Sequence, residues 1–199
     1  MMPSTTRVEQ FIFAKTLFFL HMKKYVCLLL ITCSAVFTSF AQKITIENGK
    51  LNGILPVNES GKITYQVVKS VDGAGKDELY KRGRKWFVKT YNSANQVLQV
   101  NDPSTGELTG KGIFPIVESY IGTAHTYPVR HLLAVDIKEG KYRIVLTDFV
   151  IEEKGESINV EKIPTVGRKW IDKFYTKVNT EAEALVASLQ KALATADDF

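Results

Sequence analysis

A long amphipathic helix is the feature that most constrains how this chain can fold. Its apolar residues recur at intervals of three and four, which places them on one helical face: Ile171, Phe174, Val178, Ala182, Leu185, Leu189 and Leu193. The spacing predicts a helix over 168–195. A second pattern predicts a helix over 76–91, with Asp77 and Glu78 in its first turn, where the helix dipole favours negative charge. Both helices need an apolar surface to cover, and Gly83 on the buried face of the second would let it lie close to a sheet.

A β-hairpin supplies part of that surface. Segments 129–138 and 141–151 alternate in polarity around Glu139-Gly140, which predicts a two-residue turn. Such a turn fixes the register, because a slip of one residue would turn every side chain to the other face. On one face it pairs Val129 with Val150, Leu133 with Leu146, Val135 with Ile144, and Ile137 with Tyr142. On the other it sets Asp136 opposite Arg143, two opposite charges.

Further strands are expected over 63–71, 96–100 and 107–116, with Gly110 and Gly112 predicting a bulge or a close approach. Residues 117–128 are expected to form a loop. Residues 42–61 read as an irregular lead-in with turns at Asn48-Gly49 and Asn52-Gly53. The order β-α-β-β-β-β-α predicts one α+β domain, residues 62–199, in which both helices pack on one face of an antiparallel sheet.

The N-terminal segment predicts export. Met22-Lys23-Lys24 is followed by twelve apolar residues, 26–37, and then by Ser39-Phe40-Ala41, the layout of a secretory signal peptide. We expect cleavage after Ala41, so that no transmembrane span is left, and a periplasmic, cell-surface or secreted location. Residues 1–21 are expected to be a mis-called extension, with Met22 as the start. A lipid anchor on Cys33 is the minor alternative, because Thr32 is unusual before a lipidated cysteine.

Removal of 1–41 changes the charge of the chain. The full sequence has a net charge of +5, and the leader holds four basic residues and one acidic residue, so the mature domain carries +2. This is far from the basic footprint of a nucleic-acid-binding domain, and we expect no nucleic-acid partner. Both cysteines, Cys27 and Cys33, leave with the leader, so the mature domain has neither a disulfide nor a cysteine nucleophile.

Several short motifs resemble a known family in their order and spacing. These are Asp77-Glu78-Leu79-Tyr80 with Trp86, Thr105-Gly106-Glu107-Leu108 after Asp102, Gly110-Lys111-Gly112, and Gly140-Lys141-Tyr142-Arg143. Over about 62–151 the chain resembles a family of secreted bacterial domains of unknown function with a TBP-like fold, that is, like the TATA-box-binding protein. Ala74-Gly75 departs from the expected Ser-type helix cap. The resemblance implies a fold and an envelope location, and no catalytic residues.

The expected register makes His131 and Asp148 the candidate catalytic residues. It sets them opposite each other as the polar pair on an apolar hairpin face. A carboxylate beside an imidazole fixes the tautomer and raises the basicity, as general-base catalysis requires. A structural hydrogen bond is the simpler interpretation, because no nucleophile is evident nearby.

The candidate binding residues are Lys81, Lys85 and Lys89, a stripe on one helix face that could attract an anionic glycan, lipid or acidic partner. A solvated helix face is the simpler interpretation. Gly73-Ala74-Gly75-Lys76 precedes a helix N-terminus but departs from a phosphate-binding loop at Ser70 and Asp77. His125 and His131 lack ligand spacing, so no metal or other cofactor is expected. Trp86 and Trp170 are expected to anchor helices to the sheet.

These observations favour a non-catalytic binding or assembly module of the bacterial cell envelope. The partner is open among an envelope protein, a glycan and a lipid, and the face of the sheet opposite the helices is the expected contact surface. The alternative hypothesis is a small exported hydrolase-like enzyme that uses His131 and Asp148.

Overall fold

The computed structural model of the chain describes residues 46–91, 97–120, 122–153, 155–163 and 168–195. All of these lie within one unit, residues 42–199. The expected signal peptide over 22–41, the extension over 1–21, the lipid-anchor candidate Cys33 and the first residue of the strand expected over 96–100 lie outside the described residues.

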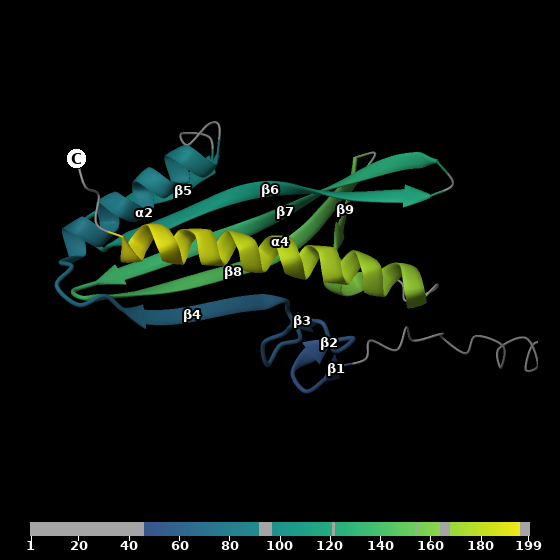
Figure 1. Ribbon diagram of the computed structural model, residues 1–199, viewed down its shortest axis with the longest axis horizontal. Coiled ribbons are helices and arrows are strands. Elements are labelled where there is room, and N and C mark those ends of the chain that lie inside the picture. Colours follow the sequence, from purple (N-terminus) through teal and green to yellow (C-terminus); the bar gives the residue numbers. More distant parts are fainter. Residues whose placement is uncertain (1–45, 92–96, 121, 154, 164–167, 196–199) are drawn as a thin grey trace, which may run out of the picture. The chain divides into compact units, whose positions relative to one another are not determined.

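An antiparallel sheet forms the body of the domain, in the order β4-β8-β7-β6-β5 (Figure 1). A further strand, β9, pairs with β8 beyond the end of β4. Two α-helices and one short 3-10 helix, η1, complete it. The bounds are β4 Thr64–Ser70, α2 Lys76–Thr90, β5 Leu98–Asp102, β6 Glu107–Tyr120, β7 Thr123–Lys138, β8 Lys141–Glu153, β9 Glu156–Asn159, η1 Val160–Lys162 and α4 Arg168–Ala194.

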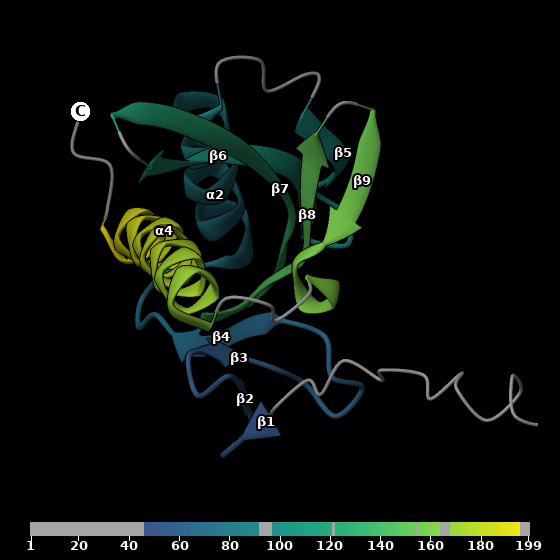
Figure 2. The same ribbon diagram turned by 90° about the vertical axis from the view of Figure 1, so that its right-hand side faces the viewer.

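Both α-helices pack on the same face of this sheet, which confirms the expected α+β architecture. In Figure 2 the strands from β6 to β4 curve around α4, which is seen nearly end on. Gly83 lies where α2 contacts both the sheet and α4. A Cβ atom at Gly83 would lie 3.0 Å from Leu108 of β6, 3.5 Å from Leu193 of α4 and 3.7 Å from Ile137 of β7. The absence of a side chain therefore allows α2 the close approach that the sequence predicts.

The N-terminus of α2 is capped from the hairpin turn. Gly75 has no side chain to cap the helix, and the carboxylate of Glu139 accepts the backbone N–H of Lys76 at 3.0 Å instead. Lys76 also donates through Nζ to the carbonyl of Ser104 at 2.6 Å. The missing Ser-type cap is thus replaced by a charged group from the β7–β8 turn.

The expected loop over 117–128 is wrong. Strand β6 continues to Tyr120 and β7 begins at Thr123, so the two strands pair along the whole segment. Pro115 and Pro128 suggest a break, but they lie directly opposite each other. Two prolines can face each other in an antiparallel ladder at a position where the N–H groups would point away from the partner strand, because no hydrogen bond between these strands is then lost.

The expected β7–β8 register holds near the turn and fails beyond Leu132. Asp136 pairs with Arg143, and Leu133 with Leu146, as predicted. Arg130, however, pairs with Val150, so that Asp148 and Phe149 together oppose His131. This is a β-bulge, and Asp148 adopts the left-handed conformation with φ 58°. The predicted pairs Val129–Val150 and His131–Asp148 are therefore wrong.

The lead-in over 42–61 also needs correction. It contains a three-stranded sheet of two-residue strands, β1 Ile46–Glu47, β2 Lys50–Leu51 and β3 Leu55–Pro56. Both Asn-Gly turns are confirmed, with positive φ at Asn48, Gly49, Asn52 and Gly53, as a tight hairpin turn requires. Leu51 and Leu55 are buried in the core, so the segment is part of the folded domain.

Candidate functional site

His131 lies in an aromatic part of the core. Its ring stacks on Phe114 at a centroid distance of 5.1 Å, and its Nε2 atom is 2.9 Å from the hydroxyl of Tyr91. Only 1% of the residue is exposed. Burial lowers the pKa of His131 to about 4, partly opposed by a contact with the Val129 backbone. The imidazole is therefore neutral near pH 7, and it borders a hollow of about 270 Å³ that Asp148 also lines.

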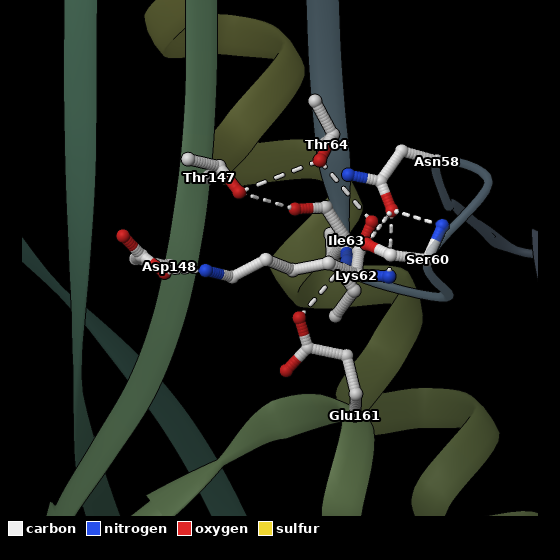
Figure 3. A network of polar contacts seen from close by, with 8 residues as sticks. All are labelled: Asn58, Ser60, Lys62, Ile63, Thr64, Thr147, Asp148 and Glu161. Atoms are coloured by element: carbon white, nitrogen blue, oxygen red, sulfur yellow. Dashed lines mark hydrogen bonds and ion pairs between the residues drawn. The ribbon is translucent and has the colours of Figure 1, made fainter.

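Asp148 takes part in a polar cluster where β8 meets the start of β4 and Glu161 of η1 (Figure 3). Its carboxylate forms an ion pair with Lys62, and this contact raises the pKa of Lys62. Next to it, the Thr147 hydroxyl donates to the carbonyl of Ile63 at 2.9 Å, and Glu161 accepts the Ile63 N–H at 2.9 Å. The bulge occurs where the edge partner of β8 changes from β4 to β9, and these contacts close that junction.

The bulge breaks the predicted one-to-one pairing of the two catalytic candidates, although both still border one hollow. Alternation along β8 would turn Asp148 toward the core, where its carboxylate would be buried without an opposite charge. The bulge instead places Phe149 in the core, fully buried, and leaves the Asp148 side chain 43% exposed. His131 contacts the Tyr91 hydroxyl and Asp148 pairs with Lys62, in place of the direct carboxylate–imidazole contact that the enzyme hypothesis assumes.

The glycine turn before α2 is already occupied by an anionic group. The Glu139 carboxylate lies at the N–H of Lys76, and its Oε1 is 3.4 Å from where a Cβ atom of Gly75 would lie. An external phosphate at this helix N-terminus would have to displace a carboxylate of the same chain.

Two of the three stripe lysines border a groove between α2 and α4. It has a volume of about 300 Å³, and Lys85 and Lys89 line it, whereas Lys81 does not. The described residues that line it are Arg82, Lys85, Trp86, Lys89, Ser188, Lys191, Ala192 and Thr195. Lys191 and Ser188 were missed because the sequence holds no signal for which parts of the two helices meet.

The remaining candidates have structural contacts. Trp86 is buried and donates to Ser188 at 3.0 Å, so it joins α2 to α4. Trp170 stacks on Phe174 and contacts Tyr127 of β7. His125 lies 3.5 Å from Glu153. Within the described ranges, no group of three or more His, Cys, Asp or Glu side chains could hold a metal ion. None of the helices in those ranges is long and apolar enough to cross a membrane.

The face of the sheet opposite the helices combines exposed apolar residues with charged pairs. Val68 and Ile113 are 60% and 57% exposed. Between them, the register aligns Ala134 and Val145 on neighbouring strands. Two shallow hollows of about 280 and 270 Å³ open on this face, the first bordered by Val68 and Arg143 and the second by Arg130 and Leu132. Ion pairs Asp136–Arg143 and Arg130–Glu152 surround the apolar residues. We call this surface the open face.

An antiparallel sheet with helices on one face and an open second face defines a class of α+β domains, and comparison with known proteins identifies the family. Residues 65–152 match the family described as "Domain of unknown function (DUF4468) with TBP-like fold". This part of the chain is therefore a DUF4468 domain, as the motifs indicate.

Two solved structures share the fold. One is a DUF4468 family protein from Bacteroides ovatus, with a TM-score of 0.61 and 18% identity over 78% of this chain and 99% of the other. The second is a TBP-like protein from Parabacteroides distasonis, with a TM-score of 0.57 and 14% identity over 72% of this chain and 99% of the other. A comparison with curated proteins finds no match.

Proposed function

We propose that this protein is an exported, non-catalytic binding or assembly module of the bacterial cell envelope, and that the open face is its contact surface. The observation that carries the proposal is an apolar set on that face, in which Val68 and Ile113 are exposed and Leu132 is half-buried. Large apolar side chains exposed together, rather than singly, mark interaction sites on soluble proteins.

The composition of the open face favours a protein as the partner. Apolar side chains, Val68 and Leu132, border its two hollows beside charged ones, so the face is a mixed surface and not a cluster of one charge. Apolar residues bordered by ion pairs such as Asp136–Arg143 have the arrangement of a protein interface, with an apolar centre and a polar rim.

Export is part of the proposal because residues 22–41 have the layout of a secretory signal peptide. The basic residues at 22–24, the apolar run over 26–37 and the small residues before Gln42 support cleavage after Ala41. The absence of cysteine from the mature sequence is compatible with an oxidising compartment, because no thiol is left to react there.

Site-specific photo-crosslinking in native cells tests the contact surface. A crosslinking amino acid is placed at Ile113 or Val68 on the open face, and at Val88 of α2 as the matched control, which is 48% exposed. We expect the same discrete crosslinked protein from Ile113 and Val68 and none from Val88. Equal labelling at all three positions, or none at any of them, would contradict the proposal.

A further inference from the structure

The groove between α2 and α4 concentrates positive charge. Four of its eight lining residues are basic, and among the described residues that line it none is acidic. Helix α2 carries six basic residues against two acidic ones, although the mature chain as a whole has a net charge of only +2. The positive charge of the domain is therefore concentrated on α2, with a smaller excess on α4, and it would attract an anion there.

The floor of the groove is fixed by buried polar contacts. Trp86, 6% exposed, donates through its indole N–H to the Ser188 hydroxyl at 3.0 Å. Arg82, 9% exposed, donates to the Leu193 carbonyl at 2.9 Å and to the Glu78 carboxylate at 3.0 Å. These contacts hold the two helices at a set separation, so the groove is present without a ligand.

The rim carries the groups that a ligand would meet. Lys89 and Lys191 are exposed, and their flexible stems let two ammonium groups converge on one site beside Lys85. Neither Lys89 nor Lys191 forms an ion pair with another described residue. The hydroxyl of Thr195 adds a polar group at the end of the groove.

We infer that this groove binds a phosphate group, either free in solution or in the headgroup of an anionic lipid. Phosphate matches the site because it presents several acceptor oxygens and up to two negative charges to the ammonium groups of Lys89 and Lys191. The volume of about 300 Å³ is at the lower end for small-molecule sites, which suits a headgroup and not an extended polymer. The site lies on the helix side of the sheet, so the inference goes beyond the open-face contact and does not depend on it.

The test measures binding to two probes, with the chain from Gln42 to Phe199. Inorganic phosphate is titrated by calorimetry, and phosphatidylglycerol in phosphatidylcholine vesicles is tested by co-sedimentation. Binding to phosphate as well as to vesicles supports a soluble phosphate ligand, and binding to the vesicles alone supports a lipid headgroup. Binding to neither probe overturns the inference.

A matched pair of double variants tests the location. Lys89→Gln with Lys191→Gln removes two rim charges, and Lys81→Gln with Lys173→Gln removes two exposed charges from the same helices outside the groove. We expect the first pair to weaken binding by about tenfold or more and the second by less than about threefold. Equal losses would show diffuse attraction and contradict the site. Asp197 and Asp198, outside the described residues, stay unchanged throughout.

Discussion

Single residues decide which chemistry the core of this domain permits. His131 has the residue type of a general base, but it is enclosed by Phe114, Phe149 and Tyr91, and its hydrogen bond is to a phenol and not to a carboxylate. Burial also raises the pKa of Tyr91, so this hydroxyl stays protonated. The pair is a neutral hydrogen bond in an aromatic core, which is a structural role.

The buried imidazole predicts a pH dependence of stability. The pKa of His131 is about 4 in the folded state against 6.5 without the fold, so between these values the unfolded chain binds the proton and the folded chain does not. The free energy of unfolding therefore falls as the pH drops from 6.5 to 4, by about 3 kcal/mol from this group. Urea unfolding from pH 7 to pH 4 measures it.

His131→Gln is the control for this experiment. The variant keeps a group that can hydrogen-bond to the Tyr91 hydroxyl but does not titrate. The difference between the two proteins in free energy of unfolding should change with pH, whereas the contribution of the carboxylates is shared and cancels. Parallel curves for the two proteins would rule out a neutral, buried His131.

We expect substitutions at Asp148 to change stability through the backbone conformation and not to affect catalysis. Its left-handed φ of 58° suits Asp or Asn, and a β-branched residue is strained there. We expect Asp148→Val to reduce the free energy of unfolding by about 1–3 kcal/mol and Asp148→Asn by less than about 1 kcal/mol, since the exposed ion pair with Lys62 contributes little. Chemical denaturation distinguishes the two. Equal losses would mean that the charge, and not the backbone, is what matters at 148.

Among the helices and strands, the strength of the apolar periodicity in each segment determined which elements could be predicted from the sequence. Long periodic runs of apolar residues predict the two helices and the strands on both sides of the β7–β8 turn. The predicted bounds lie close to those in the structure. The sequence holds a signal for the bulge in β8, but a search for simple alternation of apolar and polar residues misses it. Buried residues occupy even positions at Tyr142, Ile144 and Leu146, and then odd positions at Phe149 and Ile151. A change of parity within one strand indicates an extra residue.

Other elements had no usable signal. Strands β1, β2 and β3 have two residues each, which is too short for alternation to show. The segment expected as a loop, 117–128, ends at Pro128, which favours a loop when it is considered without its partner strand. The groove depends on contacts between residues about a hundred positions apart, such as Trp86 and Ser188, and no local pattern encodes these.

The packing of α2 on the sheet predicts a strong effect at Gly112. A Cβ atom there would lie 2.3 Å from the ring of Tyr91 and 2.6 Å from His131. We expect Gly112→Ala to lower the free energy of unfolding by about 1–3 kcal/mol, because rings packed on both sides cannot move aside easily. The control is Lys111→Ala on the opposite face of the same strand, which should change stability by less than about 0.5 kcal/mol. A neutral Gly112→Ala would mean that this packing is loose.

At the scale of the whole molecule, the fold explains the asymmetry between the two faces of the sheet. Both helices cover one face, so apolar residues of the open face such as Val68 and Ile113 have no α-helix over them within the described part of the chain. This arrangement, and not a catalytic centre, is what suggests a binding module. The TBP-like fold alone does not select a partner, because one fold serves many functions.

Export is a prediction about the mature chain. Intact-mass analysis of protein from its native envelope should give a chain that starts at Gln42, as the small residues before it indicate. A lipid-modified N-terminus at Cys33 would support the lipoprotein alternative, and peptides from residues 1–21 would show that Met22 is not the start.

We propose that this domain binds a protein through its open face. Native mass spectrometry of the protein purified from its own envelope would detect such a complex. We predict a specific complex with a second protein. The complex should be lost in Ile113→Glu and kept in the control Val88→Glu, because only Ile113 lies on the open face. A bare monomer in the unmodified protein, or a complex that survives Ile113→Glu, would contradict the claim.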